Sequence, residues 1–168
     1  GFLDELAAAP WAEAVTVHVS DEGSRANLPA ILDHRDGAHV YTCGPEPYMA
    51  AVMAAAERAG FPEEARHLEY FALPEEPEWV NHPFTLRLRS GRDVEVPAEL
   101  SAAEALIAAG VPVDLKCSDG LCGVCRCDYR AGAVEHRDYV LSKAQRDTSL
   151  ILCRSRAAEP GGVLELDL

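Results

Sequence analysis

The spacing of four cysteines constrains this chain more than any other feature. Cys117-x4-Cys122-x2-Cys125 is followed by Cys153 after 27 intervening residues. This is the plant-type spacing, in which four thiolates hold a 2Fe–2S cluster. Strand-like runs follow Cys125 and precede Cys153, so rigid elements are expected to flank the ligand loop. The sequence therefore predicts an iron–sulfur centre bound by these four cysteines.

The ligand loop also carries two glycines, Gly120 and Gly123. A glycine has no Cβ, so backbone N–H groups beside it can approach the sulfur atoms closely. Hydrogen bonds to the sulfurs stabilise a negative cluster and tune its potential. We therefore expect both glycines to contribute to cluster binding.

Other interpretations of the cysteines are weaker. Structural zinc sites usually pair two short knuckles, whereas here the fourth cysteine is solitary. A disulfide scaffold is disfavoured because four cysteines crowd between Cys117 and Cys127 without a secretory signal. Cys127 is either a spare ligand or, as we favour, a buried structural cysteine.

His136-Arg137-Asp138 resembles a kinase catalytic loop, but the other kinase elements are absent, so we expect a structural loop there.

The elements around the cysteines predict a small α+β domain over residues 83–168. Two capping boxes, beginning at Ser101 and Ser142, each open a helix, and the first helix is expected to stop at Gly110. Period-two apolar positions predict strands at Phe84–Leu88, Asp93–Val96 and Val163–Leu168. A sheet crossed by one helix, with the ligand loop at its edge, is the β-grasp arrangement of plant-type ferredoxins.

Residues 1–73 alternate in a different way and predict part of an α/β fold. We expect a helical turn at Leu28–Leu32 and a helix at Pro47–Ala59, where Pro47 suits a first helical position. The expected strands are Val15–Val19, Ala38–Thr42 and Arg66–Phe71. Three strands in this alternation make half of a doubly wound, Rossmann-like sheet. No glycine-rich phosphate loop follows a strand here, so a complete dinucleotide site is not expected.

Charge and composition support a division into two domains. Residues 1–80 carry 15 acidic and 4 basic side chains, whereas residues 81–168 carry 13 and 11. Residues 74–82, rich in proline and glutamate, are expected to form an extended, solvated linker. The net charge of −13 argues against a nucleic-acid partner. We expect no membrane segment, because no apolar run approaches the required length of about 20 residues, and the unpaired cysteines suggest the reducing cytoplasm.

Two segments of the N-terminal part resemble a known family. VYTCGPEPYM, followed by HLEYF, is similar to the C-terminal half of the NAD(P)H-binding domain of ferredoxin–NADP reductase-like flavoproteins. The resemblance implies that Cys43, Gly44 and Pro45 lie beside the nicotinamide. It also implies that Phe71 lies near the contact between nicotinamide and flavin.

The C-terminal part resembles a more specific family. CSDGLCGVCRCDYRAGAVEHRDYVLSKAQRD, then LCRSRA and the terminal LELDL, look like the ferredoxin domain of phthalate dioxygenase reductase-type proteins. That family orders its parts as FMN barrel, NAD domain and 2Fe–2S domain. The resemblance implies that this chain is the C-terminal half of such a protein, with FMN in an upstream flavin domain and NAD(P)H as the electron source.

The resemblance implies electron transfer, for which neither a nucleophile nor a general base is expected. Hydride carries two electrons, whereas a 2Fe–2S cluster accepts one, so a flavin must stand between them. We expect the acceptor to be a terminal oxygenase of the Rieske non-haem iron type. The same reductase fused to a haem-thiolate monooxygenase, and a stand-alone ferredoxin-like carrier, remain alternatives.

Overall fold

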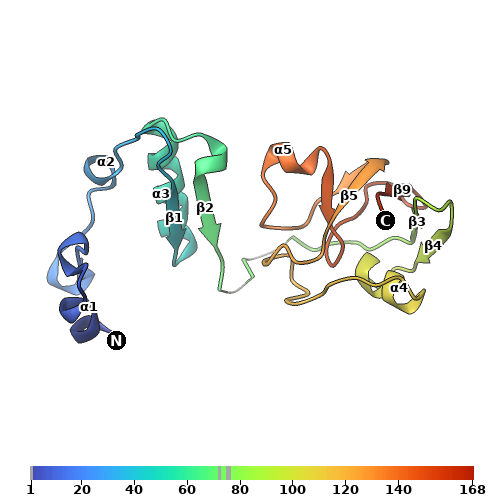
Figure 1. The fold of residues 1–168 in the computed structure, drawn as a ribbon, viewed down its shortest axis with the longest axis horizontal. Coiled ribbons are helices and arrows are strands. Elements are labelled where there is room, and N and C mark those ends of the chain that lie inside the picture. The colour runs from blue at the N-terminus through green and yellow to red at the C-terminus, as the bar shows by residue number, and fades with distance from the viewer. Residues whose placement is uncertain (1, 72, 75–76) are drawn as a thin grey trace.

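The computed structural model separates the chain into an N-terminal group of elements, from Leu3 to Glu69, and a C-terminal group, from Phe84 to Leu166 (Figure 1). It describes residues 2–71, 73–74 and 77–168. Gly1 and Ala72 of the expected first domain, and Glu75 and Glu76 of the expected linker, lie outside the described residues.

The N-terminal group is built on two parallel strands and one long helix. Its elements are α1 (Leu3–Ala8), η1 (Ala12–Ala14), η2 (Ser20–Glu22), α2 (Leu28–Ile31), β1 (Val40–Cys43), α3 (Glu46–Arg58), η3 (Glu63–Ala65) and β2 (Arg66–Glu69). Strand β1 pairs with β2 from Val40↔Arg66 to Cys43↔Glu69. The core joins Val40 of β1 to Val52 and Ala56 of α3. This strand–helix–strand order is the expected one, because a parallel pair needs a crossover connection.

One expected strand, Val15–Val19, is wrong. The described residues of this segment form no strand, and β1 and β2 pair only with each other. Val17 and Val19 are both exposed. β-propensity needs a ladder partner and a face to bury, and this segment has neither. The N-terminal sheet described here therefore has two of the three predicted strands.

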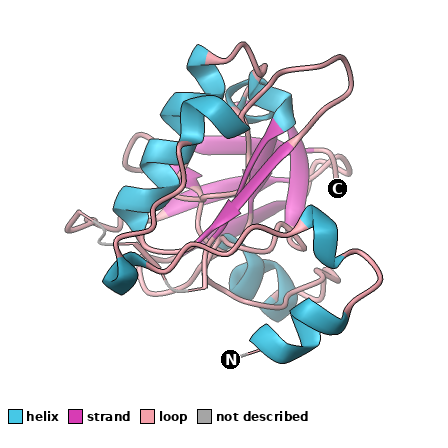
Figure 2. Ribbon diagram, turned by 90° about the vertical axis from the view of Figure 1, so that its left-hand side faces the viewer, coloured by secondary structure: helices cyan, strands magenta, loops and turns pink. Residues whose placement is uncertain are grey.

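The C-terminal group is a five-stranded sheet with the order β4-β3-β9-β5-β7. Only β3 and β9 pair in parallel, and β5 joins β9 through an irregular register between Tyr129 and Ala131. A separate antiparallel pair links β6 to β8. The elements are β3 (Phe84–Arg87), β4 (Asp93–Val96), α4 (Ala102–Ala108), β5 (Arg126–Ala131), β6 (Val134–Glu135), α5 (Lys143–Arg146), β7 (Ser149–Ile151), β8 (Arg156–Ala157) and β9 (Val163–Leu166). Figure 2 views the molecule from the side of the N-terminal group, with helices in cyan and strands in magenta.

Both predicted capping boxes are confirmed. The Ser101 hydroxyl accepts from the Glu104 backbone N–H, and the Glu104 carboxylate accepts from the Ser101 backbone. Ser142 and Gln145 make the same reciprocal pair at the start of α5. Leu106 of α4 is fully buried in the core that also contains the buried faces of the sheet. The caps thus fix the helix starts that bring α4 onto β4 and α5 next to β7.

Residues 77–82 of the expected linker are exposed and form neither helix nor strand, and arginines of the C-terminal group contact them. Arg137 donates to the Asn81 side chain at 2.6 Å and to the Val80 carbonyl at 3.3 Å, and its guanidinium lies 4.6 Å from the Trp79 ring centroid. The guanidinium of Arg156 donates to the His82 carbonyl at 2.9 Å. Residues 79–82 are therefore held on the C-terminal group by two buried arginines.

The two groups also meet directly. The backbone N–H of Lys143 donates to the Glu63 carboxylate at 2.9 Å. The rings of Tyr70 and Tyr139 lie 5.4 Å apart between centroids.

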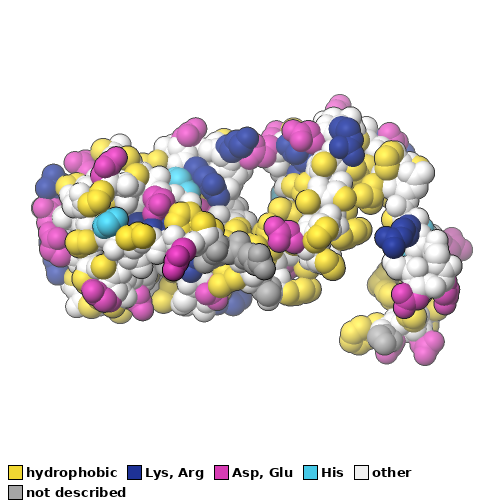
Figure 3. Space-filling model, turned by 180° about the vertical axis from the view of Figure 1, so that it is seen from behind, with side chains coloured by type: hydrophobic (Ala, Val, Ile, Leu, Met, Phe, Trp, Pro, Cys, Tyr) yellow, Lys and Arg dark blue, Asp and Glu magenta, His cyan; other side chains and the backbone are white. Residues whose placement is uncertain are grey.

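Hydrophobic side chains are conspicuous on the N-terminal group in the view of Figure 3. Among the described residues, exposed examples include Trp11, Ile31 and Tyr41. Among all residues that the structure describes, no helix is both long enough and apolar enough to cross a bilayer.

Candidate metal centre

The four predicted ligands come from one loop and from the end of one strand. Cys117, Cys122 and Cys125 lie between α4 and β5, and Cys153 follows β7, which pairs with β5. Cys125 and Cys153 are buried, whereas Cys122 is exposed and Cys117 is intermediate. The strand pair β5–β7 thus fixes the inner two cysteines, and the loop carries the outer two toward the surface.

The thiols associate two by two. The Cys153 thiol donates a hydrogen bond to Cys125, and this bond, opposed by burial, leaves the pKa of Cys125 lowered to about 6. Burial raises the pKa of Cys117, but hydrogen bonds from the Asp119 backbone and the Cys122 thiol outweigh it and lower that pKa to about 7. Across residues 2–71, 73–74 and 77–168 no three His, Cys, Asp or Glu side chains converge on one metal position. A binuclear centre takes two thiolates on each iron, so two pairs suit it better than they suit one four-coordinate ion.

The loop backbone provides hydrogen-bond donors to the sulfurs. The Asp119 N–H lies 3.4 Å from Cys117 Sγ, and the Gly120 backbone donates to Cys153. Gly120 adopts φ +73°, and a Cβ built there would lie 2.8 Å from Arg154 Cγ and 3.3 Å from the backbone of Asp138. Gly123 also has positive φ. The donor set of four paired thiols and the close-fitting glycine turns fit a 2Fe–2S cluster.

Cys127 differs chemically from the four predicted ligands. It is buried on β5, its thiol donates to the Asp128 carbonyl at 3.2 Å, and burial raises its pKa to about 11. A thiol that resists ionisation is a poor metal ligand, because the thiolate is the ligating form. These properties favour the structural interpretation of this cysteine.

The predicted nicotinamide-edge residues lie at the carboxyl ends of β1 and β2. An open pocket of about 450 Å³ is lined there by Gly44 and Phe71, together with Glu46 and Tyr70. Cys43 ends β1 and Pro45 precedes α3, so they flank Gly44 without being among the residues that line the pocket. Phe71 is 89% exposed. The structure therefore brings two of the four predicted residues to one pocket, at the sheet edge where ligands bind in α/β folds.

The sequence interpretation missed a buried residue beneath the ligand loop. Asp138 is 4% exposed, and its Cα lies against Gly120. The sequence predicts only a structural loop for His136-Arg137-Asp138. Nothing local in the sequence shows that residue 138 meets residue 120.

Comparisons with known proteins agree with this geometry. Residues 87–158 match the family described as 2Fe-2S iron-sulfur cluster binding domain. The chain is 37% identical over 172 residues to the phthalate 4,5-dioxygenase oxygenase reductase subunit of Pseudomonas putida, covering 99% of this chain and 52% of that protein. The chain spans about half the length of the curated relatives it matches.

Solved structures also resemble the whole chain. Phthalate dioxygenase reductase matches with a TM-score of 0.59 and 34% identity, covering 100% of this chain and 52% of that one. An intact type IV self-sufficient cytochrome P450 monooxygenase matches with a TM-score of 0.70 and 36% identity, covering 100% of this chain and 22% of that one.

Proposed function

We propose that the chain carries electrons from NAD(P)H and FMN to a terminal oxygenase. Residues 87–158 match the 2Fe-2S iron-sulfur cluster binding domain family, and the homologues of the chain are phthalate dioxygenase reductase-type proteins. In this proposal Cys117, Cys122, Cys125 and Cys153 hold a 2Fe–2S cluster, and FMN belongs to an upstream domain. The acceptor is a Rieske non-haem iron oxygenase.

The observation that carries the proposal is the two-by-two arrangement of the thiols beside backbone donors. When bound, the cluster accepts and releases one electron at a time. Cys117 and Cys122 would hold one iron, and Cys125 and Cys153 the other, as the thiol hydrogen bonds pair them. The N–H groups of Asp119 and Gly120 donate to ligand sulfurs and thereby favour their negative charge.

In the same proposal residues 1–73 form the C-terminal half of the NAD(P)H-binding domain, 74–82 a linker and 83–168 the ferredoxin domain. The pocket at Gly44 and Phe71 would face the nicotinamide, with Cys43 and Pro45 supporting the turn. This assignment is supported by the parallel β1–α3–β2 unit, whose strand ends form the pocket edge.

The test is a chemical analysis of the purified 168-residue chain. We expect a red-brown protein with about two irons and two acid-labile sulfides per chain. Cys122→Ser removes an exposed ligand and is expected to bleach the visible bands. The matched control Cys127→Ser changes a buried thiol outside the two pairs and leaves them intact. NADH alone is expected to leave the visible spectrum of this chain unchanged, whereas dithionite bleaches it. A colourless, folded chain containing stoichiometric zinc contradicts the proposal.

A second candidate function is delivery of electrons to a fused haem-thiolate domain. It is favoured by the self-sufficient cytochrome P450 monooxygenase, whose structure matches the whole chain with a higher TM-score than phthalate dioxygenase reductase does. Both candidates assign the same roles to the four cysteines.

A further inference from the structure

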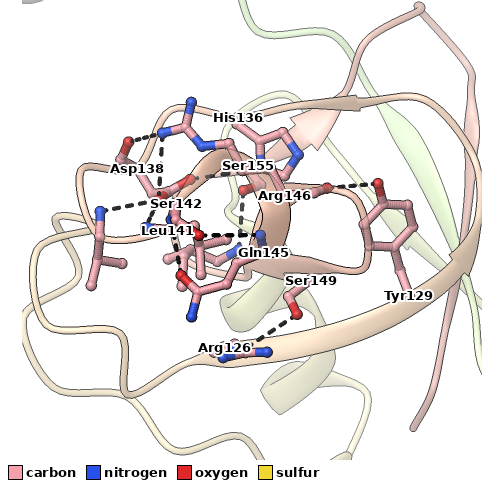
Figure 4. A network of polar contacts seen from close by, with 12 residues as sticks. Arg126, Tyr129, His136, Asp138, Leu141, Ser142, Gln145, Arg146, Ser149 and Ser155 are labelled. Carbon is pink, nitrogen blue, oxygen red and sulfur yellow. Dashed lines mark hydrogen bonds and ion pairs between the residues drawn. The ribbon is translucent and has the colours of Figure 1, made fainter. Parts of the chain in front are cut away.

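The loop between β6 and α5 contains a network of buried polar side chains that has no role so far in the proposed electron transfer (Figure 4). Its centre is Asp138, whose side chain is fully buried. Oδ1 of Asp138 accepts from the backbone N–H groups of Val140 at 3.1 Å and Leu141 at 2.8 Å. The carboxylate therefore holds the turn that follows it.

Two further side chains, His136 and Arg146, face this carboxylate. His136 Nδ1 lies 3.7 Å from Asp138 Oδ2, and the Arg146 guanidinium lies 3.7 Å from Oδ1 while donating to the Asp138 carbonyl at 2.8 Å. His136 Nδ1 and Asp138 Oδ2 are buried, and neither has a hydrogen-bond partner within the described part of the chain. This leaves an imidazole nitrogen and a carboxylate oxygen facing each other in a protected position.

The buried side chains around Asp138 are connected to the ligand loop through the backbone. Tyr139, next to Asp138, donates its N–H to the Gly120 carbonyl at 3.2 Å. Gly120 in turn donates its own N–H to Cys153. The Asp138 backbone lies so close to Gly120 that a Cβ there would reach it at 3.3 Å. The charge on the His136–Asp138 pair is therefore held directly beneath a ligand-bearing turn.

We propose that Asp138 is a positioning residue for the cluster-ligand loop, and that His136 holds a proton at Nδ1 against Asp138 Oδ2 at acid pH. The midpoint potential of the bound cluster then depends on pH. This inference rests on the proposed function, because it requires the cluster.

The charges around the His136 imidazole determine whether the midpoint potential rises or falls with pH. Burial lowers the pKa of His136, the Asp138 charge raises it and the Arg146 charge lowers it. The resulting pKa of His136 lies below the ordinary value of 6.5. At pH 7 the ring is therefore neutral, and the negative charge of Asp138 opposes addition of an electron to the loop. A proton on Nδ1 offsets that charge, so the potential rises as pH falls through the lowered pKa of His136. On reduction one electron comes from dithionite, and water supplies at most one proton to Nδ1.

The test is a redox titration of the cluster-loaded chain between pH 5 and pH 8. In the unmodified protein we expect the midpoint potential to rise on acidification. In His136→Gln, which keeps a polar side chain without a titrating ring, the rise is lost. In Asp138→Asn the potential at pH 8 is higher and the rise is also lost. An equal pH dependence in the His136→Gln and unmodified proteins overturns the inference.

A second measurement needs no variant. NMR titration of His136 in the oxidised and dithionite-reduced chain is expected to give a higher pKa in the reduced form, because the added electron favours the protonated ring. Equal pKa values for His136 in the two forms contradict the inference. A chain that binds no cluster contradicts the proposed function instead, so the two failures are distinguishable.

Discussion

At the residue scale, Gly120 is constrained both by its backbone conformation and by its neighbours. The sequence suggests that glycine allows close approach to sulfur, and the structure adds a second reason. The φ of +73° and the contacts with Arg154 and Asp138 both exclude a side chain. Two independent constraints therefore act on a residue that also donates to Cys153.

We predict that Gly120→Ala destabilises the cluster-loaded chain by about 1–3 kcal/mol, because it combines left-handed backbone strain with a steric overlap. Gly91→Ala is the matched control, since Gly91 has φ +82° but nothing within 4 Å of the new Cβ. Denaturant unfolding gives the free energies, and the decay of visible absorbance gives the rate of cluster loss. Equal losses in the two variants contradict a role for the close contact.

The four cysteines proposed as ligands stand out in the sequence because the plant-type spacing reflects the geometry of a 2Fe–2S cluster. Asp138 could not be predicted in the same way. Its partners are two backbone amides, a histidine and an arginine that only the turn into α5 brings together. Roles that depend on covalent spacing are visible in a sequence, whereas roles that depend on a tertiary turn are not.

At the element scale, local signals were more informative than pairing signals. The β4 strand occupies the predicted residues, and both capping boxes form as expected, because these features depend on neighbours within a few positions. The Val15–Val19 strand is wrong, since alternation alone says nothing about a ladder partner. The parallel pairing of β3 with the C-terminal β9 joins segments far apart in sequence and was not predicted.

Helix α4 provides a direct test of the packing of the C-terminal group. Leu106 is 0% exposed in the core, whereas its neighbour Ile107 is 47% exposed. We predict that Leu106→Ala lowers the free energy of unfolding by about 2–5 kcal/mol, because it removes apolar contacts and leaves a cavity. Ile107→Ala on the same helix is expected to cost much less, and thermal unfolding of both variants checks the difference. Similar losses contradict the assigned orientation of α4.

At the scale of the whole molecule, the two groups are connected by more than the covalent chain. Arg137 and Arg156 hold residues 79–82 on the C-terminal group. The Glu63 carboxylate accepts from Lys143, the first residue of α5, where the unpaired N–H groups of a helix favour a negative partner. The ring of Tyr70 lies 5.4 Å from that of Tyr139, whose backbone N–H donates to the Gly120 carbonyl.

This arrangement predicts that the contact between Tyr70 and Tyr139 sets the distance between the pocket and the cluster. In the cluster-loaded chain we expect paramagnetic broadening of the Phe71 amide signal in NMR spectra, because Phe71 lines the pocket next to Tyr70. Tyr139→Ala combined with Glu63→Ala removes both contacts but retains the backbone bond from residue 139 to Gly120, so the broadening is expected to decrease. Tyr41→Ala, at an aromatic that is 74% exposed on β1, serves as the control. Unchanged broadening in the double variant means that the linker alone holds the two groups together.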